Sequence, residues 1–180
     1  MMARMNRYLV APVLGLALVL GVSLPTRAHA EVPAHTRVSV NYANPKQFTE
    51  NRFYGWQDRY NNVDYLGPLK AYLVKRATPM LKAGQRLEVT ITDIQLAGGY
   101  EPWLGSQWSH VRIMSDRYPP RIDLTFRLTG KDGQVIREGK RTLRNLGYLT
   151  SGATMPGNTD PLRYDKALLD SWLRRGMHHL

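Results

Sequence analysis

The residues best suited to binding or catalysis gather in one segment, residues 93–121. The segment combines carboxylates, arginines and two tryptophans in a connection that is too long for an ordinary loop. Tryptophan rings stack on sugar faces or anchor protein interfaces, and arginine binds carboxylate or phosphate through paired hydrogen bonds. The candidate binding residues are Asp93, Glu101, Trp103, Trp108, Arg112 and Arg121.

Two interpretations of this segment remain open. Trp103 and Trp108 either contact a partner or fold back as a lid over one end of the sheet. Asp93 interrupts a strong strand pattern, which favours a structural role: pairing with Arg112 or Arg121, or accepting backbone N–H bonds in the following turn. Alternatively, Asp93 and Glu101 form the two-carboxylate pair of a small glycan hydrolase.

Other catalytic chemistry has little support in the chain. It contains no cysteine and no G-x-S-x-G motif, and Ser106 or Ser109 beside His110 is a coincidental match. His178 and His179 have no H-x-x-x-H spacing or carboxylate cluster to support metal binding. We therefore assign no catalytic residue and expect neither a metal site nor a cofactor.

The first 30 residues have the pattern of a cleavable secretory signal peptide. Arg4 and Arg7 precede an apolar run from Leu9 to Leu24, which is shorter than the roughly 20 residues that span a bilayer. Pro25 and the small-residue motif formed by Ala28 and Ala30 follow, so we expect cleavage after Ala30. The processed protein would have no transmembrane segment and would lie in the periplasm or be secreted.

The remaining chain, residues 31–180, is expected to form a single domain without disulfides, and it is strongly basic. The whole sequence has a formal charge of +11, and residues 1–30 contribute three arginines and no acid, which leaves +8. Outside the inner membrane such a charge suits an anionic glycan or lipid headgroup, although it also serves solubility. An envelope protein is the other candidate partner; no nucleic acid is expected, and the protein is expected to be a monomer.

Periodicity predicts alternating elements along residues 37–175. Strands are expected at 37–42, 86–92, 110–114, 122–129 and 135–143, with a bulge or change of face at Asp93 and a turn at 131–134. Helices are expected from Leu66 to about Ala77 and from Asp160 to Gly176, whereas 46–64 is expected to be irregular. This order, β-α-β-β-β-β-α, predicts an α+β domain: a mostly antiparallel sheet of four to five strands with two helices on one face.

Short motifs along most of this domain resemble an exported proteobacterial family, domain of unknown function 3016. The motifs occur in order over about residues 37–175 and are Thr92–Gly98, Glu101-Pro102, Val111–Ile113, Pro119–Ile122, Lys131–Gly133, and Pro161–Tyr164 through Trp172-Leu173. The resemblance implies a Gram-negative source and a periplasmic or secreted location. It implies no established activity and transfers no site residue.

The favoured function is therefore a non-catalytic envelope protein that binds a partner through the aromatic and arginine-rich 97–121 segment. The glycan hydrolase using Asp93 and Glu101 is the alternative from enzyme chemistry. A structural or stress-related periplasmic protein without a small ligand is the third.

Overall fold

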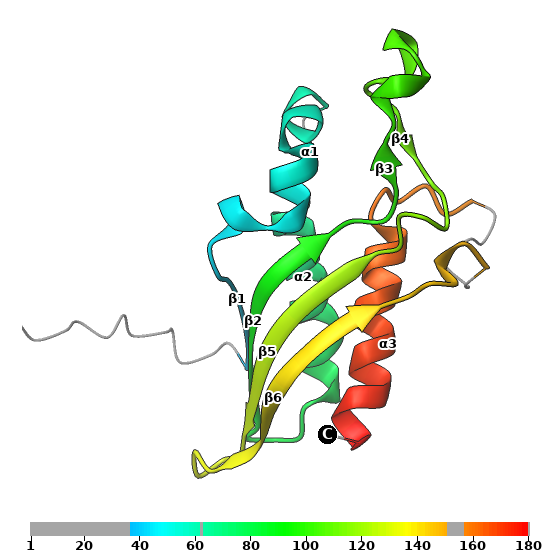
Figure 1. The fold of residues 1–180 in the computed structure, drawn as a ribbon. Coiled ribbons are helices and arrows are strands. Elements are labelled where there is room, and N and C mark those ends of the chain that lie inside the picture. The colour runs from blue at the N-terminus through cyan, green and yellow to red at the C-terminus, as the bar shows by residue number, and fades with distance from the viewer. Residues whose placement is uncertain (1–36, 62, 151–156, 180) are drawn as a thin grey trace, which may run out of the picture. The chain divides into compact units, whose positions relative to one another are not determined.

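The computed structural model describes residues 37–61, 63–150 and 157–179; the expected signal peptide with Ala28 and Ala30 lies outside them. Within these residues, one sheet contains β1 (Val38–Tyr42), β2 (Arg86–Gln95), β5 (Arg121–Thr129) and β6 (Val135–Arg144), in the spatial order β1-β2-β5-β6. The β1–β2 pair is parallel and the other two pairs are antiparallel (Figure 1). The parallel pair requires a crossover, which the helical residues between β1 and β2 provide.

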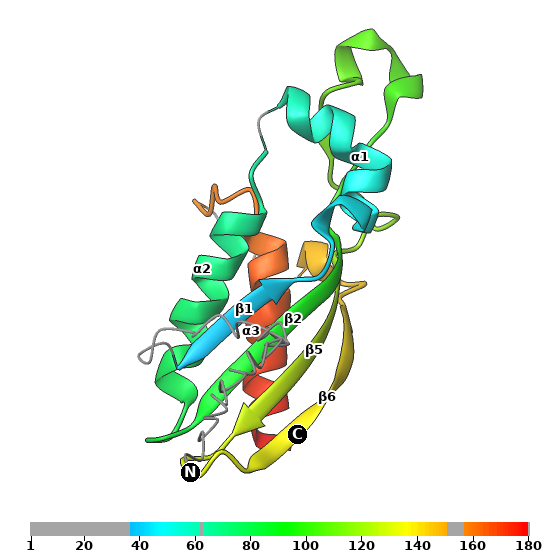
Figure 2. The same ribbon diagram turned by 90° about the vertical axis from the view of Figure 1, so that its left-hand side faces the viewer.

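Two helices, α2 (Leu66–Ala77) and α3 (Arg163–His179), cover the same face of this sheet (Figures 1 and 2). Leu69 and Leu73 of α2 and Leu169 of α3 are fully buried in the core that they share with β2 and β5. The other face is polar, since Glu88, Arg127 and Glu138 face one another across three strands. The predicted α+β class, with a mostly antiparallel sheet and two helices on one face, is confirmed.

A third helix, α1 (Thr49–Tyr60), occupies the stretch for which the sequence predicted irregular structure. The helix was missed because its amphipathicity is inverted. Its buried face carries Glu50, Tyr54 and Asp58, spaced four residues apart, whereas Phe53 and Trp56 point to solvent with 68% and 59% exposure. A search for an apolar stripe cannot recognise such a helix.

The break in alternation near Asp93 is a β-bulge, not a change of face. The register of β2 against β5 shifts between Ile91 and Asp93. Because of this extra residue, Ile94 and Leu96 return to the helix-covered face and join the same core as Ile91. The bulge thereby presents Asp93 toward the start of α1.

Beyond β2, the chain forms an arm, residues 99–113, that projects next to α1 (Figures 1 and 2). Its base is an antiparallel pair of two-residue strands, β3 (Gly99–Tyr100) and β4 (Arg112–Ile113), so the strand expected at 110–114 is shorter than predicted. Two 3₁₀ turns, Pro102–Leu104 and Ser106–Trp108, form its outer end.

Two further local signals agree with the structure, but the expected end of the last helix at Gly176 is wrong, because α3 begins at Arg163 and continues to His179. Asp160 accepts a hydrogen bond from the Leu162 N–H just before α3 begins, and Gly133 adopts a φ of 79° in the β5–β6 turn.

None of the helices in the described residues has the length and apolar character that a membrane-spanning helix needs.

Candidate functional site

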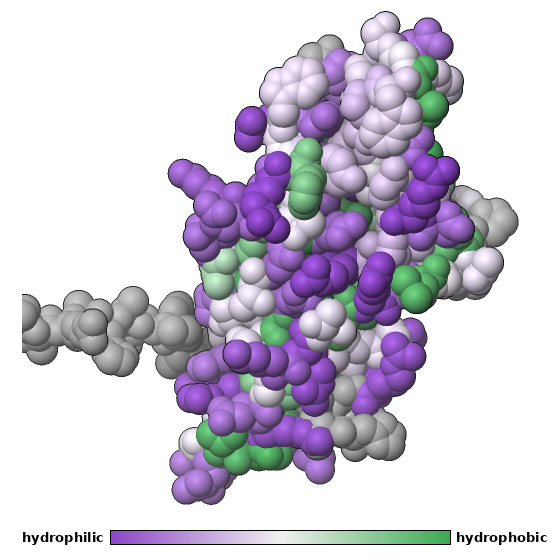
Figure 3. Space-filling model, viewed as in Figure 1, coloured by the Kyte–Doolittle hydropathy of each residue, from purple (hydrophilic) through white to green (hydrophobic). Residues whose placement is uncertain are grey.

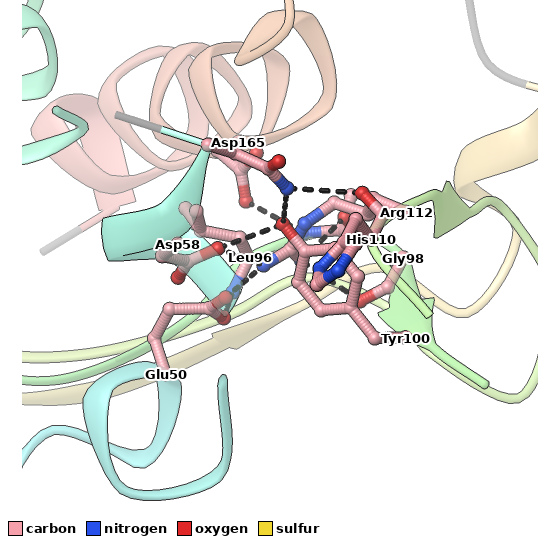
Figure 4. A network of polar contacts seen from close by, with 10 residues as sticks. Glu50, Asp58, Leu96, Gly98, Tyr100, His110, Arg112 and Asp165 are labelled. Carbon is pink, nitrogen blue, oxygen red and sulfur yellow. Dashed lines mark hydrogen bonds and ion pairs between the residues drawn. The ribbon is translucent and has the colours of Figure 1, made fainter. Parts of the chain in front are cut away.

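The guanidinium of Arg112 holds the base of the arm against α1. It contacts the carboxylates of Glu50 and Asp58 on α1, the latter at 3.3 Å, and its side chain is 16% exposed (Figure 4). It also donates hydrogen bonds to the carbonyl oxygens of Ala97 and Gly98, at 3.1 and 3.0 Å. One side chain therefore joins α1, the end of β2 and β4.

Aromatic rings enclose the guanidinium on its remaining sides. Its central carbon lies 4.9 Å from the ring centre of Tyr100 and 5.5 Å from that of Tyr54, which are cation–π distances. The Tyr100 hydroxyl donates to Asp58 at 2.9 Å and accepts from the Asn61 amide at 3.2 Å. These contacts dock α1 on the arm by directional bonds.

Two carboxylates from helix first turns hold the backbone that follows β2. The Leu96 N–H donates to Glu50 at 2.7 Å, and the Ala97 N–H donates to Asp165 of α3 at 3.2 Å (Figure 4). Glu50 and Asp165 are 0% and 1% exposed. The start of the arm is thus positioned from both helices.

Three buried carboxyl groups surround Arg112, so the cluster is short of positive charge. Burial raises the pKa of Glu50 to about 8, against the lowering influence of Arg112. Burial likewise raises the pKa of Asp165 to about 7, against the lowering effects of the Ala97 N–H and Arg112. Burial alone would lower the pKa of Arg112, but Glu50 and Asp58 raise it above its ordinary value. Burial therefore makes Glu50 and Asp165 harder to ionise than exposed carboxyl groups.

This cluster is built for positioning. Its charged groups are buried and bonded mainly to one another and to the backbone. Within the described part of the chain, one oxygen each of Asp58 and Asp165 has no hydrogen-bond partner. No group of three or more His, Cys, Asp or Glu among the described residues is arranged to hold a metal ion. The surface that the cluster positions is therefore the stronger candidate site.

That surface is the aromatic tip, which we define as the exposed large hydrophobic side chains of α1 and the arm. It holds six of the nine such side chains among the described residues: Phe53, Trp56, Trp103, Leu104, Trp108 and Val111. The rings of Trp56 and His110, 5.4 Å apart, join its two halves. Exposed apolar side chains gathered in this way mark interaction sites.

Acidic groups are withdrawn from the aromatic tip. Within residues 49–61 and 101–111, Glu50, Asp58 and Glu101 are all buried, whereas Arg52 and Arg59 are exposed. Figure 3 shows pale side chains of intermediate hydropathy over α1 and the arm, and more strongly hydrophilic ones lower on the same view. Exposed acids occur again at Asp64 and Asp116, beyond these two segments.

The predicted site residues fall into separate places. Asp93 accepts hydrogen bonds from the backbone N–H and the hydroxyl of Thr49, both at 2.6 Å, at the first turn of α1. Arg121 lies 3.8 Å from Asp93 and pairs with Asp123. Of the roles considered for Asp93, the structure shows both an arginine neighbour and a backbone N–H bond, although that N–H belongs to α1 and not to the next turn.

Glu101 is engaged elsewhere, at the outer side of β3. It accepts a hydrogen bond from the Tyr118 hydroxyl at 2.8 Å and lies 3.7 Å from Arg117. Asp93 and Glu101 therefore have different partners on different elements. Trp103 and Trp108 are 68% and 45% exposed on the arm, so they do not form a closed lid over the sheet.

Three residues of the cluster escaped sequence reasoning: Glu50, Asp58 and Asp165. The first two carried a usable signal, because with Tyr54 they repeat at four-residue steps opposite Phe53 and Trp56. Asp165 resembles an ordinary first-turn acid of a helix, where acids are favoured anyway, and carried none.

Fold and site together define an α+β domain with a projecting aromatic arm held by a buried ionic cluster. The chain belongs to the family described as protein of unknown function (DUF3016), whose model matches residues 36–175. The family resemblance inferred from the short motifs is thus confirmed. No curated protein matches the chain.

Replacing Arg112 with Met should lower the free energy of unfolding by about 3–5 kcal/mol, because Glu50 and Asp58 would stay buried without a counter-charge. Urea unfolding followed by circular dichroism measures this loss. Adding Glu50→Gln to the Arg112→Met variant should restore part of it. A loss below about 1 kcal/mol for Arg112→Met would show that the cluster does not hold the arm.

The Asp165 carboxyl should make stability fall with rising pH. Burial raises the folded-state pKa of this carboxyl to about 7. Its contribution to the free energy of unfolding is therefore full below the unfolded-state pKa and is lost as the pH rises through about 7. Asp165→Asn keeps an acceptor for Ala97 and should gain about 1–3 kcal/mol on the wild type between about pH 5 and pH 9.

Chemical unfolding at a series of pH values compares the two proteins, with exposed Asp116→Asn as the control. A difference between wild type and Asp165→Asn that does not change with pH would contradict the raised pKa. Some pH dependence should remain in the variant, since the pKa of Glu50 is raised as well.

Proposed function

We propose that the protein is an exported, non-catalytic binding protein of the cell envelope that holds an anionic partner on its aromatic tip. The observation that carries the proposal is the concentration of exposed Trp and Phe side chains on two elements that a buried cluster locks together. The partner would receive apolar contacts from the rings and charge contacts from Arg52 and Arg59.

Export to the periplasm or beyond is supported by the N-terminal sequence. A positive start, an apolar run and the Ala28-His29-Ala30 motif occur in the order typical of secretory signals.

A binding role is supported by the energetic cost of the tip. Leaving a Phe or Trp side chain in water forgoes roughly 1.5–3 kcal/mol of hydrophobic stabilisation. Several aromatic side chains of the tip remain exposed in spite of this loss, whereas the polar and charged side chains of the cluster are buried next to them. Such an arrangement gains its stabilisation when a partner covers the rings.

The two alternatives have less support. A hydrolase using Asp93 and Glu101 would need both carboxylates to face one substrate, yet each is bonded to its own partners on different elements. A structural protein without a ligand would have no use for solvent-facing Trp103 and Phe53.

Binding by the tip is tested by co-sedimentation of the processed protein with wall sacculi and, separately, with anionic lipid vesicles. We expect binding to one of them that weakens by at least about tenfold in the Trp103→Ala/Trp108→Ala variant. The thermal unfolding of this variant should match that of the wild type, because both side chains are exposed.

Ile136→Ala, at an equally exposed position in β6 near the β5–β6 turn, is the matched control and should bind as the wild type does. Absence of binding to both targets would overturn the proposal. Binding that Trp103→Ala/Trp108→Ala leaves unchanged would also overturn it, because the tip would then have no part in it.

Export predicts a processed form. The protein recovered from the periplasmic extract or the medium of a Gram-negative host should begin at Glu31, because the small-residue motif ends at Ala30. Mass spectrometry of the intact protein reads this directly, and Ala28→Leu/Ala30→Leu should leave the precursor uncut. Full-length protein confined to the cytoplasm would contradict export.

A further inference from the structure

We infer that the partner of the aromatic tip is the surface of an anionic lipid bilayer, into which Trp103, Leu104, Trp108 and Val111 insert. This inference rests on the proposed binding function and names its ligand. It follows from the kind of side chains at the tip, from their charge surroundings and from the form of the surface.

The side chains of the arm suit the boundary between lipid headgroups and acyl chains. Tryptophan concentrates at that boundary because its ring is apolar and its N–H is polar. Trp103 and Leu104 occupy one 3₁₀ turn, and Trp108 occupies the next, at the outer end of the arm. The arm stands clear of the sheet beside α1, so these turns can meet a flat surface (Figures 1 and 2).

The charges of the tip match an anionic bilayer. Arg52 and Arg59 are exposed on α1, as Phe53 and Trp56 are. The guanidinium of Arg52 lies 5.8 Å from the Phe53 ring centre. Basic side chains beside apolar ones give surface binding to anionic lipids. An exposed carboxylate at the tip would oppose this approach.

The buried cluster removes that obstacle. Glu50 and Asp58 lie on α1 and Glu101 on the arm, and each is turned inward: the first two onto Arg112 and the third onto Tyr118. The tip can therefore approach lipid phosphates without bringing carboxylates with it. The same cluster keeps α1 and the arm together, so that both contact one plane.

The form of the surface favours lipid over a glycan chain. Sites for small polar ligands are usually concave and place polar groups next to apolar ones. Four hollows of the described surface lie elsewhere: two on the open sheet face, one at the end near Gly84 and Lys131, and one between α2 and α3. None of these is lined by residues of the tip.

The experiment uses tryptophan fluorescence of the processed protein with vesicles of phosphatidylglycerol and phosphatidylethanolamine that carry brominated acyl chains. Inserted Trp103 and Trp108 should shift to shorter wavelength and be quenched, whereas vesicles of phosphatidylcholine should give little change. Leu104→Ser/Val111→Ser keeps every tryptophan as a reporter and should weaken vesicle binding by at least about tenfold.

A charge-matched pair of variants separates the tip from general basicity. Arg52→Gln/Arg59→Gln should weaken binding by about 30-fold at low salt, whereas Arg86→Gln/Lys131→Gln, at the start of β2 and in the β5–β6 turn, should weaken it far less. Equal effects of the two pairs would overturn the inference, because the bilayer would then attract the whole basic domain without orientation. Unquenched tryptophans on bound protein would overturn it too.

The two proposals fail in different ways. Tip-dependent binding to sacculi without binding to vesicles would overturn the lipid inference and leave the proposed function standing. Failure to bind both sacculi and vesicles would overturn both. Quenching that depends on Leu104 and Val111 supports both.

Discussion

The enclosed guanidinium of Arg112 is the interaction on which the outer part of the domain depends. The arm has a base of two residue pairs between β3 and β4, and a ribbon of that size is not stable in water by itself. Arg112 supplies the missing stability by bonding to Glu50, Asp58 and two carbonyl groups at once. Charged hydrogen bonds in a buried setting are strong, and the loss of one partner is costly, so the geometry is well defined.

The cluster also decides which way α1 faces. Hydrophobic burial alone would turn Phe53 and Trp56 inward, since apolar side chains gain by leaving water. The inner position, however, is the one that offers Glu50 and Asp58 their bonds to Arg112, Tyr100 and the Leu96 N–H, and these directional bonds fix the orientation of α1. The aromatic side chains consequently remain outside. The orientation of α1 that buries the acidic side chains is thus the one that exposes the aromatic side chains of the tip.

The sequence predicted those parts whose pattern follows ordinary burial. Strand alternation around Val89 and Phe126, the Asp-Gly turn at Gly133 and the leucines of α2 and α3 all place apolar residues inside, and the structure agrees with each. Segment 97–121 was singled out for its composition; in the structure its Arg112 is enclosed in the cluster and its Trp103 is exposed on the arm. The helix α1 was missed because a search for an apolar stripe does not recognise a helix whose inner face carries Glu50, Tyr54 and Asp58.

The division between a polar interior and an apolar exterior explains why the two ends of the domain differ. Where α2 and α3 cover the sheet, they bury leucines against it, and packing alone suffices for stability. At the other end of the domain, a hydrophobic contact between α1 and the arm would have buried the aromatic rings that are now exposed. A buried ionic contact leaves the rings of Phe53, Trp56, Trp103 and Trp108 exposed. It also keeps buried the acidic side chains that an anionic surface would repel. The cost of burying several carboxylates, visible in the raised pKa of Glu50 and Asp165, is therefore understandable as the condition for an aromatic surface that carries positive charge alone.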